Sequence, residues 1–233
     1  MGRKKKPVDQ VITKKTNIKT GMDLSIFVIL TYIVLSLGFL FKPTPSLLIT
    51  LLPWVMLLTT VFVVYKIKPN TFLLTIFFLI ISLTFILEAI GVLTGIPFGE
   101  FFYLNTLGFK VLDVPIIVAI NWSMIIFSSY VFTQRLLEKI KFDNRLVLML
   151  TPIIVTLIDY IMEPVAIYLK LWNWSSGMIP TSNYISWFIF TLLCTTFIYF
   201  VTWGKKINNS KYLLAFLIGQ TIFFTIINIL IIA

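Results

Sequence analysis

Three carboxylates lie in segments that are otherwise almost entirely apolar. Asp159 and Glu163 are four residues apart in the run DYIMEP, and Glu88 ends a long run of Leu, Ile and Phe. On a helix, a spacing of four places Asp159 and Glu163 on one face, one turn apart, where like charges repel. Neither has a cationic neighbour within a turn, so in an apolar site one of them should keep its proton. A neutral carboxylic acid beside a carboxylate suits general acid–base chemistry.

The composition excludes most other catalytic chemistries. The chain has no histidine and one cysteine, Cys194. These two facts exclude Ser-His and Cys-His nucleophile pairs, His-containing zinc sites, cysteine metal cages and a disulfide within the chain. We therefore expect the carboxylates to carry any acid–base step, which by itself requires no metal and no cofactor.

The elements that position these acids should be membrane helices. Of the 233 residues, 59% are hydrophobic and 12% are charged, whereas soluble domains have roughly 25% charged residues. A helix needs about 20 apolar residues to cross a bilayer. The sequence therefore predicts an all-α, polytopic protein with about seven transmembrane helices. The predicted spans are 23–41, 46–65, 71–93, 114–134, 146–168, 184–203 and 211–232.

The distribution of basic residues predicts the orientation of these spans. Sixteen of the 19 basic residues lie before the first predicted span or after the second, fourth and sixth, and only Lys42, Lys110 and Lys170 lie in the other loops. Cytoplasmic loops carry an excess of Lys and Arg. We therefore expect a multi-pass protein of the cell membrane with a cytoplasmic N-terminus and an outer C-terminus.

The same distribution divides the chain into two parts. Residues 1–22 should form a disordered, basic cytoplasmic tail, and residues 23–233 a single transmembrane helical domain. Seven basic residues in the tail precede any apolar run, so they indicate contact with anionic lipid rather than nucleic acid.

Amides and aromatic residues accompany the acids. They are Tyr103, Asn121, Trp122, Trp172, Trp174, Asn183 and Trp187. Trp and Tyr are also ordinary residues of the membrane interface, so Trp174 and Trp187 have two interpretations. Asn121 lies within a span, where an amide requires a hydrogen-bond partner.

The segment after Glu88 interrupts the apolar pattern with turn residues. It contains Thr94, Gly95, Pro97, Phe98 and Gly99, and it lacks the spacing of a phosphate-binding loop. Gly permits positive φ or close approach, and Pro97 ends the helical path. We expect a loop that folds back over the helix ends and keeps a cavity for an apolar substrate dry.

Two blocks of residues resemble a known family. The first is E-x-x-G-V-x-T-G-x-P-F-G-x-x-x-Y from Glu88, followed by V-P at 114–115 and N-W at 121–122. The second is D-x-x-x-E-P from Asp159, followed by W-x-W at 172–174 and P-x-x-N-x-x-x-W at 180–187. Together they resemble the membrane-embedded carotenoid hydratases, which include carotenoid 1′,2′-hydratases and bisanhydrobacterioruberin hydratase. The family more often has Asp where this chain has Glu163, and a Tyr nearer to the second Gly of the loop, where Phe101 and Phe102 precede Tyr103.

The resemblance implies hydration of the terminal C1=C2 double bond of an acyclic (psi) carotenoid end group. A neutral carboxylic acid would protonate the alkene, and water would attack the tertiary cation. We expect Asp159 to be the donor, Glu163 to share its proton or hold water, and Glu88 to be the base. Asn121 and Asn183 would orient the water. The remaining candidates, Tyr103, Trp122, Trp172, Trp174 and Trp187, would bind the substrate.

Three other interpretations fit parts of the sequence. A carotenoid cyclase also begins by protonating such an alkene. A proton-coupled transporter would use intramembrane acids, but Glu88, Asp159 and Glu163 are all predicted at one end of their spans. No polar relay is apparent across the other half, and no inverted repeat is visible. The third interpretation is an assembly factor without chemistry.

Overall fold

The computed structural model describes residues 23–40, 45–205, 207 and 210–232. The predicted disordered tail, residues 1–22, lies outside the described residues. The seven helices of the described part are α1 (Leu24–Gly38), α2 (Pro45–Ile67), α3 (Thr71–Thr94), α4 (Ile116–Lys139), α5 (Val147–Tyr168), α6 (Thr181–Thr202) and α7 (Lys211–Ile232). Two short 3-10 turns, η1 (Asn105–Leu107) and η2 (Asn144–Leu146), lie in loops.

Six of the described helices, α2 to α7, are long and apolar enough to cross a membrane. The first predicted span, 23–41, is longer than the helix that forms there, because α1 has only 15 residues. At 1.5 Å per residue α1 is about 22 Å long, whereas the hydrocarbon core of a bilayer is about 30 Å thick. The expected seven long spans are therefore corrected to six long helices and one shorter helix.

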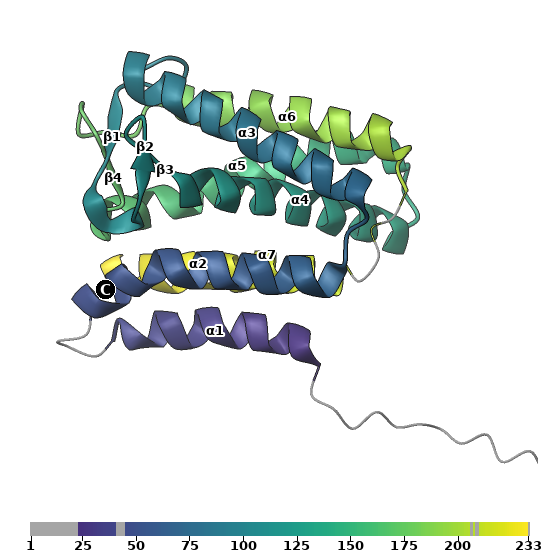
Figure 1. The fold of residues 1–233 in the computed structure, drawn as a ribbon, viewed down its shortest axis with the longest axis horizontal. Coiled ribbons are helices and arrows are strands. Elements are labelled where there is room, and N and C mark those ends of the chain that lie inside the picture. Colours follow the sequence, from purple (N-terminus) through teal and green to yellow (C-terminus); the bar gives the residue numbers. More distant parts are fainter. Residues whose placement is uncertain (1–22, 41–44, 206, 208–209, 233) are drawn as a thin grey trace, which may run out of the picture.

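The helices lie nearly parallel in layers (Figure 1). The shorter α1 forms one outer layer, α2 and α7 the next, and α4 and α5 the next, with α3 and α6 on the opposite outer face. The central helix is α4, and 83% of its apolar 18-residue window is buried. This position explains why α4 carries several buried hydroxyl residues where a lipid-facing helix would carry Leu or Ile. The helix continues to Lys139, beyond its predicted end at 134.

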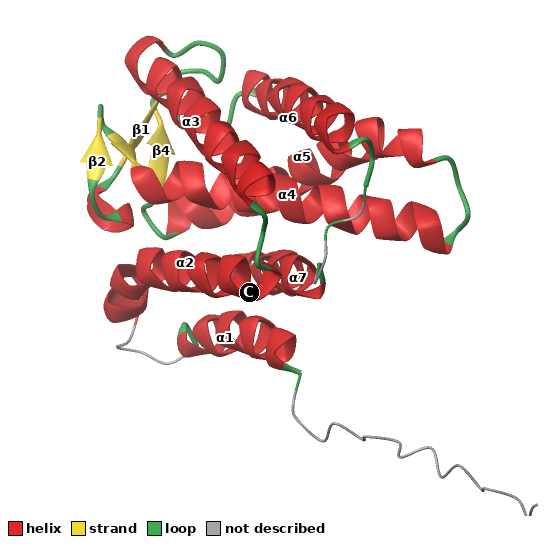
Figure 2. Ribbon diagram, turned by 45° about the vertical axis from the view of Figure 1, so that its right-hand side comes forward, coloured by secondary structure: helices red, strands yellow, loops and turns green. Residues whose placement is uncertain are grey.

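The all-helical expectation is confirmed, and four short strands lie in the loops between the helices. They are β1 (Phe101–Tyr103), β2 (Lys110–Val111), β3 (Val114–Pro115) and β4 (Trp172–Trp174). The antiparallel pairs are β1 with β4 and β2 with β3. Figure 2 shows these strands together at one end of the helix bundle. The β1–β4 pair joins the loop after α3 to the loop after α5, whereas β2 and β3 both lie in the loop after α3. We call this end of the bundle the strand end.

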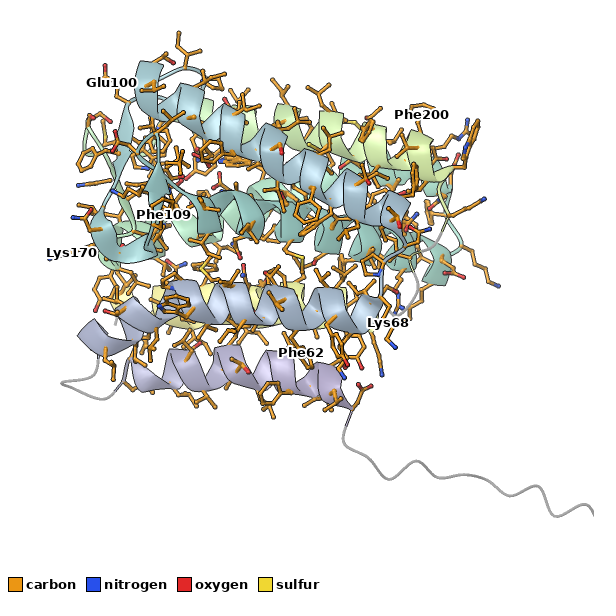
Figure 3. The ribbon with its side chains drawn as sticks, viewed as in Figure 1. Phe62, Lys68, Glu100, Phe109, Lys170 and Phe200 are labelled. Carbon is orange, nitrogen blue, oxygen red and sulfur yellow. The ribbon has the colours of Figure 1, made fainter. Side chains whose placement is uncertain are left out.

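Charged residues lie at both ends of the bundle. Figure 3 shows Glu100 and Lys170 at the strand end and Lys68 at the opposite end. At that opposite end Lys211 Nζ lies 2.8 Å from Asp23 Oδ2. Its hydrogen bond, assisted by hydrogen bonds from Ser25, lowers the pKa of Asp23 to about 2. The contact joins the starts of α1 and α7.

A buried polar chain connects the central helix to α7, α1 and α2. Asn121 Oδ1 accepts a hydrogen bond of 2.5 Å from Gln220 Nε2, which also donates to Tyr32 Oη at 3.1 Å. Tyr32 Oη lies 2.9 Å from Thr59 Oγ1. The mid-span amide predicted to need a partner therefore finds one, in a contact between helices.

Candidate carboxylate site

Glu88 ends a stripe of buried residues on α3. Ile76, Ile80, Thr84 and Glu88 recur every fourth residue, and all are buried. This spacing keeps side chains on one helix face. Glu88 is only 2% exposed, and its Oε2 accepts a hydrogen bond of 2.8 Å from Tyr103 Oη. Burial, together with the nearby Glu88 carboxyl group, raises the pKa of Tyr103 well above its ordinary value, so the phenol stays protonated and acts as the donor.

The second and third acids occupy one face of α5. Glu163 Oε2 accepts hydrogen bonds from the indole nitrogens of Trp172 at 3.1 Å and Trp174 at 2.8 Å. One amide joins the two acids, because Asn183 Nδ2 donates to Asp159 Oδ2 at 2.8 Å and to Glu163 Oε1 at 3.2 Å. Asp159 is fully buried, and its Oδ1 has no hydrogen-bond partner among the described residues. Glu163 is therefore surrounded by donors, whereas Asp159 has one donor on one oxygen.

The β1–β4 pair brings four aromatic side chains to the acids. Phe101 is opposite Trp174, and Tyr103 is opposite Trp172. Side chains alternate between the faces of a strand, and these four are buried whereas Phe102 is exposed. One face of this small ladder therefore donates hydrogen bonds to both Glu88 and Glu163, although the two acids lie on different helices.

The start of α6 closes another side of the site. Trp187 lies one turn after Asn183, and its ring stacks on that of Trp122 from α4 with 3.8 Å between centroids. The Trp187 ring also lies near the rings of Phe98, at 5.4 Å, and Phe190, at 5.9 Å. Both indole rings are nearly fully buried, so Trp122 and Trp187 belong to the interior of the site and not to an exposed interface belt.

The loop 95–100 folds back over the helix ends. Ser182 Oγ donates to the Phe98 carbonyl at 2.7 Å, and Ser186 Oγ donates to the Pro97 carbonyl at 3.0 Å. Gly95 has a φ of 72° and Gly99 a φ of 112°, values that favour glycine. Thr94 is exposed and bonds the Ile90 carbonyl of its own helix, so it does not face the acids.

These elements enclose a small polar cavity of about 20 Å³. A cavity needs roughly 10–15 Å³ to hold a water molecule, which also needs two to four polar partners. The cavity is therefore large enough for about one water. Its lining consists of Glu88, Phe98, Phe101, Tyr103, Trp122, Glu163, Trp172, Trp174, Asn183 and Trp187.

The structure brings together most of the residues singled out from the sequence. Asp159 does not line the cavity itself and joins the site through its hydrogen bond from Asn183, and the loop residues Gly95, Pro97 and Gly99 cover the cavity without lining it. Two candidates lie apart from the acids. Asn121 makes its hydrogen bonds with Gln220 and does not line the cavity, and Thr94 faces outward. Phe101 was not a candidate, yet it lines the cavity. The alternation of residues in FFY and WNW is the signal that could have identified it. Among the described residues, no group of three or more His, Cys, Asp or Glu side chains forms a possible metal site.

Replacing Gly91 with alanine should disturb the packing of α3 against the loop 95–100. A Cβ at residue 91 would lie 2.6 Å from Phe98 Cδ2 and 3.1 Å from Phe101 Cε1. Both rings are buried, so Phe98 has little room to move, and overpacking of this kind costs about 1–3 kcal/mol. We expect Gly91→Ala to lower the thermal unfolding temperature in detergent, whereas Ile90→Ala, which removes an exposed side chain on the same helix, should change it less. Equal unfolding temperatures for Gly91→Ala and the unmodified chain would contradict the tight packing.

Comparisons with known proteins give one family and one relative. The profile of the family described as "Carotenoid biosynthesis protein" matches residues 46–233. A bisanhydrobacterioruberin hydratase of Haloarcula japonica is 29% identical over 107 residues. That alignment covers 44% of this chain and 36% of the relative, so the chain matches little more than a third of the relative's length. No solved structure gives a significant match.

Proposed function

Because the chain belongs to the carotenoid biosynthesis protein family, we propose that it hydrates the terminal C1=C2 double bond of an acyclic carotenoid end group. The observation that carries this proposal is the pair Asp159 and Glu163, bridged by the Asn183 amide, with Glu163 and Glu88 lining the same aromatic cavity. The similarity to a named hydratase supports the same reaction.

The hydrogen bonds favour different protonation states for the two acids on α5. Glu163 accepts from three N–H groups, and donors of this kind favour the ionised form of a carboxyl group. Asp159 accepts from one N–H group, and its second oxygen is unpartnered among the described residues. Two like charges four residues apart on a buried helix face would repel. The pair therefore holds one proton. Asp159 carries this proton at rest, and Glu163 is the ionised member that faces the cavity.

The reaction uses this proton and a second carboxylate. The proton passes from the Asp159–Glu163 pair to C2 of the alkene, leaving a tertiary cation at C1. The faces of Trp122, Trp174 and Trp187 stabilise this cation. The oxygen of the cavity water then bonds to C1, and Glu88 accepts the proton that the water loses. The sum is the addition of one water, with no electron transfer and no cofactor.

Tyr103 positions Glu88 for this step. Its hydroxyl donates to Glu88 Oε2, which leaves Oε1 to accept a proton from water. Asn183 holds the opposite pair in place from α6. The water would therefore lie between a base on α3 and an acid pair on α5.

Substrate binding requires the site to open. A cavity of about 20 Å³ is far smaller than the roughly 150 Å³ cavity that accepts benzene in a protein core, and a branched isoprenoid end is at least as bulky. We infer that the loop 95–100 is the element that moves, because the two hydrogen bonds that join its Phe98 and Pro97 carbonyls to side chains of α6 can break without unfolding a helix. Its opening would admit the end group from the lipid.

The membrane arrangement is part of the same proposal. We infer a single helical domain, residues 23–233, in the cell membrane, with the strand end on the outer side. Lys66, Lys68, Lys139 and Lys211 lie at helix termini of the opposite end, which supports a cytoplasmic location for that end. The chain would then begin inside, with the basic residues 1–22, and end outside.

Pigment analysis tests the proposed reaction. The full chain is expressed in a host that makes lycopene or another acyclic carotenoid, beside an empty-vector control. We expect new pigments whose mass exceeds that of the substrate by one water or two. A new pigment of unchanged mass would indicate a cyclase instead, and an unchanged pigment profile with the protein present in the membrane would overturn both.

A further inference from the structure

Buried hydroxyl groups without partners gather on the four helices that carry the site. Nine buried side-chain atoms have no hydrogen-bond partner within the described residues, and eight of them lie on α3, α4, α5 and α6. One is Asp159 Oδ1. Six others belong to residues that are fully buried, which we call the hydroxyl track: Thr84, Ser128, Ser129, Thr151, Thr191 and Thr195.

The track continues the buried faces that hold the acids. Thr84 lies one turn from Glu88 on α3, and Thr191 lies one turn from Trp187 on α6. Thr151 lies eight residues from Asp159 on α5, about 12 Å along the helix axis. Trp122 stacks on Trp187, and both helices run away from the strand end, so Ser129 on α4 and Thr195 on α6 lie at similar depth.

Bonded polar groups lie beyond the track, at the end opposite the strands. Tyr130 is fully buried next to Ser129, and its hydroxyl accepts a hydrogen bond of 3.0 Å from Gln134 Nε2. The same amide nitrogen donates to the Gly204 carbonyl in the loop after α6 at 3.1 Å. Polar groups therefore occur at every level from the carboxylates to the far end. These groups lie in the half where the sequence alone shows no polar relay.

Other hydroxyl groups of the described helices behave differently, on the site helices as well as outside them; Ser123 and Thr133 on α4 each donate to the carbonyl four residues earlier. Thr31 and Ser36 on α1 donate to the carbonyl four residues earlier, and so does Thr221 on α7. This is the usual way for Ser and Thr to satisfy their hydroxyl groups inside a helix. Buried polar groups in proteins nearly always have a protein or water partner. The track hydroxyls lack a protein partner among the described residues, which leaves water as the partner that they require.

We propose that the hydroxyl track holds a file of water molecules that supplies the carboxylate site from the end opposite the strands. This inference rests on the proposed hydration, which consumes one water in every turnover. The cavity has room for about one water, and aromatic rings and the loop 95–100 cover it at the strand end. A bound polyene would cover the lipid side. Water in the track would also return the proton from Glu88 to the acid pair after each turnover.

Valine substitutions test the track, because valine has nearly the shape of threonine but lacks its hydroxyl group. Thr191→Val and Thr84→Val should each lower the rate of hydrated pigment formation about tenfold, since each removes a hydroxyl that would bond a water of the file. Thr191→Ser, which keeps the hydroxyl, should restore most of the rate. Thr60→Val is the matched control, because Thr60 is also buried and unpartnered but lies on α2.

Cys194 provides a readout that does not depend on the reaction. It is the one cysteine of the chain, is 4% exposed, and lies between Thr191 and Thr195 on α6. Silver ions react with thiols through water and do not enter dry protein. In the experiment, membranes are first treated with Ag⁺, and the protein is then denatured and labelled with a maleimide. We expect Ag⁺ to have reacted with the Cys194 thiol, so that the maleimide no longer labels it. Thr191→Val should slow the reaction of Ag⁺ with Cys194.

The two measurements separate the track from the reaction. Wild-type rates in Thr84→Val and Thr191→Val, or a Cys194 that Ag⁺ leaves fully reactive to maleimide, would overturn the water file while leaving the proposed hydration intact. A chain that makes no hydrated pigment but whose Cys194 is protected would overturn the hydration and keep the water file.

Discussion

Replacing Glu163 with glutamine should lower the formation of hydrated carotenoid by about 100-fold or more. Both carboxylate oxygens of Glu163 accept hydrogen bonds from N–H donors, Oε2 from two indoles and Oε1 from Asn183. A glutamine amide must turn its NH₂ group toward one of these donor sets, so at least one donor is left without an acceptor. Losing the general acid–base group typically costs a further factor of 10²–10⁴. Pigment chromatography of membranes with matched protein levels measures the effect.

Two control variants separate loss of chemistry from loss of structure. Asp113→Asn removes an exposed carboxylate between β2 and β3, at the same end of the molecule but outside the loop 95–100, and should retain the unmodified rate. Glu163→Asp keeps a carboxylate and should retain more product than Glu163→Gln. If Glu163→Gln forms hydrated pigment at the unmodified rate, the acid pair on α5 is not the proton source.

Replacing Glu88 with glutamine should have the second large effect, also about 100-fold. Glu88 is the carboxylate of the cavity that lies outside the α5 pair, and its hydrogen-bond donor is the Tyr103 hydroxyl. A glutamine can still accept this hydrogen bond, so the structure should persist, but it cannot take the proton from the attacking water. The rate of hydrated pigment formation in isolated membranes is the measurement.

A double-mutant cycle shows whether Tyr103 acts through Glu88. Tyr103→Phe removes the hydrogen bond and should lower the rate about tenfold, a cost in line with a hydrogen bond to a charged group. Residues in one hydrogen-bond network are not additive, so Glu88→Gln with Tyr103→Phe should be no slower than Glu88→Gln alone. Additive losses would mean that Tyr103 contacts the substrate directly instead of positioning Glu88.

The family assignment, the helices and the spacing of the acids followed from the sequence alone. The bounds predicted for 71–93, 146–168 and 211–232 agree with α3, α5 and α7 to within a residue at each end, because a long apolar run ended by Pro, Gly or charge determines a membrane helix locally. The placement of Asp159 and Glu163 on one face needed only the helical repeat. Membership of the carotenoid biosynthesis family is confirmed by the profile match.

The contacts between segments that are far apart in the chain could not be predicted from the sequence and are seen only in the tertiary structure. Glu88 and Glu163 are 75 residues apart, and no local rule predicts that they line one cavity. The three-residue strands β1 and β4 are too short to give a periodic signal, and their pairing exists because the two loops meet at one end of the bundle. This pairing directs Tyr103 to Glu88 and Trp172 to Glu163.

The packing of the helices likewise decides which hydrogen-bond partner each buried polar group finds. Asn121 was expected to orient water, but α7 places Gln220 beside it, and the two amides bond each other. The track hydroxyls looked in the sequence like ordinary residues of apolar helices. Whether a buried threonine bonds its own helix or faces a neighbour depends on its rotamer and on the opposing helix. The sequence by itself therefore determined which residues could do chemistry and which helices carry them. Only the packing of α3, α4, α5 and α6 decided which of these residues meet, because their contacts join positions far apart in the chain.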